Sequence, residues 1–89
     1  MTVELFGMAR ALTGVGAVSL VVDEPIELGT VLAALAERHP ELVGRVLDSG
    51  TFAPLEPHIV LLDGRRKVSL DERITSADKP CLLLVPSGG

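Results

Sequence analysis

With 89 residues, the chain is long enough for one small domain, and its core must be aliphatic because Phe6 and Phe52 are its only aromatic residues. Twelve Asp and Glu residues against eight Lys and Arg residues give a formal net charge of −4, which argues against nucleic-acid binding by phosphate neutralisation. One cysteine excludes an internal disulfide and a multi-cysteine metal site, and no apolar run is long enough to cross a bilayer, so we expect a cytoplasmic protein that binds neither a metal nor a cofactor of its own.

The N-terminal segment predicts two strands of a hairpin. Residues 2–6 alternate between polar and apolar side chains, which is typical of a half-buried strand. Residues 17–22 predict a second strand, which Pro25 keeps from continuing. The intervening residues 7–16 contain three glycines, and although residues 8–12 are compatible with a short helix, we interpret the segment as a loop.

The strongest helix signal follows the hairpin. Leu28, Val31, Leu32 and Leu35 recur at helical spacing and predict one amphipathic helix. Pro40 disfavours a helical conformation at the residue before it, so the helix should end there. The pattern of residues 41–47 predicts a shorter amphipathic piece.

The second half of the chain predicts three further strands. Residues 58–62 form an apolar run, and the Asp-Gly pair after it is a strong hairpin-turn signal. Residues 65–68 would return as an edge strand, and residues 69–79 are polar and irregular, with a 3₁₀ turn. The last strand, residues 81–85, is so apolar that we expect it to be buried on both faces at the centre of a sheet.

This order of elements predicts an α+β fold, a β-grasp with a mixed sheet of about five strands covered by one main helix. We expect the domain to span residues 1–85 and residues 86–89 to form a flexible diglycine tail. Gly88 and Gly89 have no side chain to bury, but a tail without Cβ atoms can enter a narrow channel. The Gly89 carboxylate is therefore the first candidate for chemistry.

Several short motifs together resemble the ubiquitin-like sulfur carriers of prokaryotes. They are Leu5-Phe6-Gly7 in the first strand, residues 33–40 in the helix, Asp63-Gly64 in the turn and the final Gly88-Gly89. The resemblance covers the full chain and is closest to the molybdopterin synthase small subunit, in the MoaD/ThiS-like family.

The resemblance implies a carrier that is not itself an enzyme. An activating enzyme would use ATP to adenylate Gly89, and a persulfide sulfur would then displace AMP to leave a thiocarboxylate. Pro86, Ser87 and Gly88 would insert into the partner enzymes. The sulfur acceptor implied is the molybdopterin synthase large subunit, with neither nucleic acid nor a membrane as a partner.

Three alternatives remain open on the sequence. The sulfur could serve thiamine, cysteine or another sulfur-containing metabolite, because Val85-Pro86-Ser87 and residues 77–80 depart from the usual family pattern. Gly89 could instead be joined to target lysines, as in a ubiquitin-like protein modifier. The chain could also be a plain β-grasp interaction module.

Other candidate residues favour structural roles. Cys81 lies in an apolar run, so we expect a buried thiol rather than a nucleophile. His39 and His58 lack metal-ligand spacing, and we expect His58 to be partly exposed. The basic cluster at residues 65–67 is either a contact for an anionic partner or a charged edge that discourages aggregation.

Overall fold

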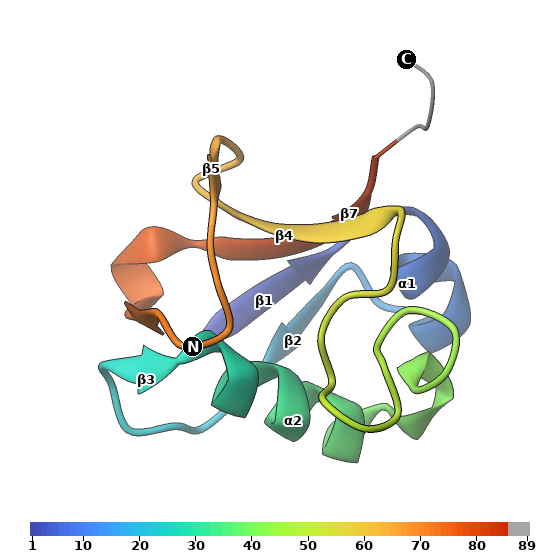
Figure 1. Ribbon diagram of the computed structural model, residues 1–89, viewed down its shortest axis with the longest axis horizontal. Coiled ribbons are helices and arrows are strands. Elements are labelled where there is room, and N and C mark those ends of the chain that lie inside the picture. The colour runs from blue at the N-terminus through green and yellow to red at the C-terminus, as the bar shows by residue number, and fades with distance from the viewer. Residues whose placement is uncertain (86–89) are drawn as a thin grey trace.

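The structure, a computed structural model, describes residues 1–85 and contains a five-stranded mixed sheet (Figure 1). The strands lie in the order β2 (Ala17–Ser19), β1 (Thr2–Leu5), β7 (Pro80–Leu84), β4 (His58–Leu62) and β5 (Arg66–Lys67). β1 and β7 are parallel, and the other neighbouring pairs are antiparallel. The predicted α+β β-grasp class is confirmed, with the most apolar strand at the centre.

The predicted main helix is α2 (Leu28–Arg38), which crosses one face of the sheet (Figure 1). The four residues of its predicted stripe are all buried, namely Leu28, Val31, Leu32 and Leu35. They pack in one core with apolar side chains of β1, β4 and β7. Burying each leucine contributes roughly 1.5–3 kcal/mol to folding, so this stripe holds the helix on the sheet.

A second helix lies where a loop was expected, and that prediction is wrong. α1 (Gly7–Thr13) follows β1 directly and buries Ala9. Gly14 ends the helix with a φ of 76°, and its backbone N–H donates to the carbonyl of Arg10. The glycines that suggested a loop therefore stand at the two ends of a short helix, where their freedom at positive φ is used.

The predicted strand at residues 17–22 is shorter than expected. β2 stops at Ser19, after which Val21 is fully exposed. The chain then forms β3 (Ile26–Glu27), which pairs with β6 (Arg73–Ile74) in a separate two-stranded sheet. Residues 69–79 were expected to be irregular, so β6 was missed, but the expected 3₁₀ turn is present as η2 (Ser76–Asp78).

The segment after α2 is less helical than residues 41–47 suggested. Only η1 (Pro40–Leu42) forms, one turn of 3₁₀ helix. Gly44 interrupts the pattern with a φ of 86°. Val46 and Leu47 are nevertheless completely buried. The amphipathic pattern therefore predicted the burial of these residues correctly, but its prediction of a helix was wrong.

The predicted Asp-Gly turn between β4 and β5 is confirmed. Asp63 and Gly64 have φ values of 55° and 68°, as in the primed turns that suit hairpins. The Arg65 N–H closes the turn on the carbonyl of Leu62 at 3.0 Å. The return strand covers only Arg66–Lys67 of the expected residues 65–68. Among residues 1–85, no helix is both long and apolar enough to cross a membrane.

Candidate functional site

The four residues predicted to carry or deliver sulfur, Pro86, Ser87, Gly88 and Gly89, lie outside the described residues. The described part of the site is therefore the surface around Val85, to which they are joined. This surface is built by the end of β7, the start of β4 and the first turn of α1.

Hydrogen bonds from both sides fix the end of β7. On one side, Leu84 is paired with His58, and the Val85 N–H donates to the carbonyl of Pro57 at 2.8 Å. On the other side, the Phe6 N–H donates to the carbonyl of Leu82 at 3.0 Å. Val85, the first residue after β7, is thus held by its bond to the residue before β4.

Exposed apolar side chains gather on the two segments that meet here. Among the described residues, six large apolar side chains are exposed, and four of them belong to this region. We call these four the apolar collar: Phe6, Met8, Leu84 and Val85. Leu84 is 40% exposed and Val85 is 39% exposed, so the expectation that residues 81–85 are buried on both faces is wrong at the end of this segment.

Gly7 brings the two segments of the collar together. Its φ is 59°, and a Cβ built on it would lie 3.7 Å from the Leu84 Cβ. The parallel register pairs Leu5 with Leu82, and the Phe6 N–H bonds to the Leu82 carbonyl, so Phe6 also lies beside β7. In the sequence, two large apolar residues of the collar, Phe6 and Met8, flank Gly7. Composition alone does not predict that their side chains are exposed.

His58, at the start of β4, is 4% exposed, so the expectation of partial exposure is wrong. Its Nδ1 lies 3.1 Å from the carbonyl oxygen of Leu55 and must donate, because a carbonyl only accepts. Nε2 is buried, and no partner for it lies among the described residues. The imidazole thus supports the loop before β4.

Cys81 is buried, in agreement with its expected structural role. Burial raises the pKa of its thiol, and the negative charge of Glu4 on the neighbouring strand raises it further. The protonated thiol is a poor nucleophile and a poor metal ligand. Residues 1–85 contain no cluster of three His, Cys, Asp or Glu side chains that could hold a metal ion.

His39 lies just after α2, where it was expected to meet the helix end or solvent. Its Nδ1 is 3.1 Å from a carboxylate oxygen of Glu41. Hydrogen bonds from the Glu41 backbone N–H and from His39 lower the pKa of the Glu41 carboxyl. The pair is local to η1, away from the collar.

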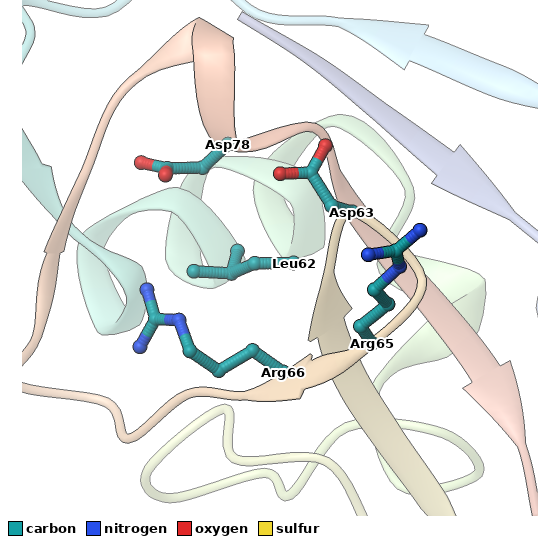
Figure 2. Close-up of a pocket in the computed structure, with 5 residues that line it drawn as sticks. All are labelled: Leu62, Asp63, Arg65, Arg66 and Asp78. Atoms are coloured by element: carbon teal, nitrogen blue, oxygen red, sulfur yellow. The ribbon is translucent and has the colours of Figure 1, made fainter.

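The basic cluster lies at the opposite end of β4 from the collar. Beside it is a surface hollow of 510 Å³ lined by Leu62, Asp63, Arg65, Arg66 and Asp78. Figure 2 shows Leu62 between Asp78 and Arg66. Arg66 also donates to a carboxylate oxygen of Glu72 at 2.6 Å. The hollow mixes both signs of charge and contains no nucleophile.

Comparison with solved structures identifies similar proteins over the whole chain. A crystal structure of SAMP1 from Haloferax volcanii superposes with a TM-score of 0.80 at 28% identity, covering 99% of this chain and 97% of that one. A second structure of this small archaeal modifier protein 1 gives 0.76 at 27% identity, with 91% of each chain covered.

A Pyrococcus furiosus protein described as molybdopterin converting factor, subunit 1, gives a TM-score of 0.66 at 21% identity, covering 91% of this chain and 88% of that one. At this identity the likeness concerns the fold. No protein-family model and no curated protein sequence matches the chain.

The sheet order, the helix across it and these likenesses define a ubiquitin-like protein of the β-grasp fold. Its neighbours share the fold that the resemblance to the MoaD/ThiS-like family implies.

Proposed function

We propose that the protein is a sulfur carrier whose terminal Gly89 is adenylated by a partner enzyme at the expense of ATP and converted to a thiocarboxylate. A carboxylate anion resists nucleophiles, so it must first become an acyl-adenylate with loss of pyrophosphate. A persulfide sulfur on a partner then displaces AMP to give an acyl disulfide, and a second thiol of the partner attacks the partner's own sulfur in that S–S bond, which releases the thiocarboxylate and leaves a disulfide on the partner. The carrier supplies the acyl group, and its partners supply the catalysis.

The observation that carries the proposal is the apolar collar at the end of the central strand. Four residues separate Val85 from the carboxylate, a reach of about 13–14 Å when extended. A partner that acts on Gly89 must therefore cover the surface around Val85. Exposed apolar side chains at that position provide an area that a partner can desolvate.

The proposed acceptor is an enzyme of molybdopterin synthesis, the molybdopterin synthase large subunit. The short motifs that resemble the molybdopterin synthase small subunit favour this pathway, and the likeness to a protein described as molybdopterin converting factor, subunit 1, is consistent with the fold that it requires. Sulfur delivery to thiamine, cysteine or another metabolite would use the same Gly89 chemistry with a different acceptor.

A second candidate function is supported by the 28% identity to a small archaeal modifier protein. In a modifier, a target lysine amine attacks the activated Gly89 carbonyl and forms an isopeptide bond. Both functions require the same activation, but they differ in the product. A sulfur carrier gives a thiocarboxylate, and a modifier gives adducts on other proteins that survive reducing agents.

The proposal is tested by deleting Gly89 in the native host. Growth is compared in media in which it depends on the molybdenum cofactor, on thiamine synthesis or on cysteine synthesis. The proposal predicts loss of growth in one of these conditions, and that condition identifies the acceptor. Wild-type growth in all three would contradict a sulfur acceptor in the molybdenum-cofactor, thiamine and cysteine pathways.

Variants of the collar test how the partner docks. Leu84→Ser should reduce the thiocarboxylated fraction of the purified protein, because it removes apolar area beside Val85. Val21→Ser is the matched control, since Val21 is a fully exposed apolar residue elsewhere on the surface. Equal fractions in the two variants would contradict docking at the collar.

A further inference from the structure

The sheet edge formed by β5 carries three consecutive cations, Arg65, Arg66 and Lys67. They are three of the eight Lys and Arg residues in a chain with a net charge of −4, and all three are exposed. Arg66 is paired with Glu72. Within residues 1–85, neither Arg65 nor Lys67 takes part in an ion pair. This edge is thus a concentrated positive charge on an otherwise acidic molecule.

The backbone of β5 offers hydrogen-bonding groups at the same edge. The Leu62 carbonyl accepts from Arg65, so Leu62 directs its backbone groups toward β5. Leu61, one residue earlier, must direct its groups toward β7. Lys67 is paired with Leu61, and alternation along an antiparallel ladder turns the Lys67 N–H and C=O outward. Elsewhere in residues 1–85, no backbone group bonds to Lys67 outside the ladder with β4.

Two surface hollows adjoin β5 and differ in the side chains that line them. One contains Asp63 and Asp78 (Figure 2). The other, of 260 Å³, has four apolar lining residues together with one carboxylate, one lysine and one histidine. Its lining residues are Pro54, Glu56, His58, Ile59, Val60, Lys67 and Val68. A segment that alternates acidic and aliphatic residues matches both the charge of the edge and the apolar residues of this hollow.

We propose that the β5 edge binds an acidic, extended segment of a partner protein as an additional strand. Main-chain hydrogen bonds to Lys67 would hold the segment, and Arg65 and Lys67 would select its charge. A second copy of this edge is excluded as the occupant because its three cations would repel these three. The inference does not depend on Gly89, because the three cations lie at the end of β4 opposite to the collar, and the hollow reaches the collar only through His58, which pairs with Leu84.

The test uses a synthetic heptapeptide of alternating glutamate and valine, titrated into the ¹⁵N-labelled full chain and followed by NMR. We expect the largest shift changes at residues 65–68 and smaller ones at residues 54–60, which line the hollow. Arg65→Glu combined with Lys67→Glu should weaken binding at least about tenfold, which corresponds to two partly exposed ion pairs. The Arg45→Glu control reverses an exposed charge in the turn after η1 and should leave binding unchanged.

Lys67→Pro separates strand addition from charge attraction alone, because it removes the outward N–H of an edge residue. Its fold is checked by the amide spectrum; if it fails to fold, the double charge reversal decides the test. Equal binding of a lysine–valine heptapeptide, or undiminished binding by the double charge-reversal variant, would overturn the proposal. A chain without Gly88 and Gly89 should bind the peptide as the full chain does, which distinguishes this inference from the proposed sulfur chemistry.

Discussion

Cys81 and Gly89 are the two positions at which this chain could carry sulfur, and the described residues argue against the first. The Cys81 side chain is 7% exposed at a shallow surface hollow that Glu4 and Lys79 also line, and burial, followed by the nearby Glu4 carboxylate, raises the pKa of its thiol. A thiol attacks an electrophile only as the thiolate, so the folded protein holds Cys81 in its unreactive form.

We therefore expect iodoacetamide to alkylate Cys81 slowly in the folded protein. The rate should rise at least about tenfold in denaturing urea, where the thiol is exposed and its pKa is ordinary. Mass spectrometry of quenched samples measures both rates. Equal rates in the two conditions would show that Cys81 is accessible in the native state.

Glu24 joins the loop after β2 to the start of η2. One carboxylate oxygen accepts from the Ser76 N–H at 2.6 Å, and the other accepts from the Ser76 hydroxyl. Both bonds lower the pKa of the Glu24 carboxyl, and the bond from the Ser76 hydroxyl has the larger effect. Because the lowered pKa belongs to the folded state, the carboxylate stabilises the fold above its ordinary pKa, and the contribution is lost as pH falls through the lowered value.

Glu24→Gln should accordingly be less stable than the wild type at pH 7, and the difference should shrink toward zero as the solution is acidified. Urea unfolding at a series of pH values measures it. Ser76→Ala, which removes one donor, should lose stability over the same pH range. A difference between wild type and Glu24→Gln that does not change with pH would contradict this role.

At the scale of elements, the contact between α1 and β7 depends on Gly7. A side chain at this residue would have to adopt a φ of 59° and would meet the Leu84 side chain. A β-branched residue is the least suited to such a conformation.

Gly7→Val should destabilise the protein by about 1–3 kcal/mol through backbone strain. Gly16→Ala is the matched control, because Gly16 does not adopt a left-handed φ and its nearest neighbour is the flexible end of Arg10. Thermal or urea unfolding gives both values. Equal losses in the two variants would contradict the importance of the Gly7 conformation.

The elements also show what the sequence could predict. α2 was predictable because its apolar stripe is long and regular. α1 was not, since its ends are glycines and Ala9 is its only fully buried residue. β3 and β6 have two residues each, too few for a period to appear. In β7, an uninterrupted apolar run predicts a central strand, but it does not predict that the Leu84 side chain at the end of the strand is exposed.

At the scale of the whole molecule, the fold separates two surfaces along β4. The apolar collar lies where the strand begins, and the basic edge lies beyond its end. Both surfaces are available for partners, while the core between them is formed by α2 and the inner face of the sheet. In the proposed function, the reaction takes place at Gly89, and the folded domain provides the surfaces that partner proteins recognise.

The most direct test of that assignment is the intact mass of the protein purified from its native host under conditions that protect thiocarboxylates. We predict a species about 16 Da heavier than the free acid, from replacement of one oxygen by sulfur. Fragmentation should place the added mass on Gly89, and it should persist in Cys81→Ser. A mass increase located on Cys81, or its absence in a host that is actively using the pathway identified by deletion of Gly89, would contradict the account.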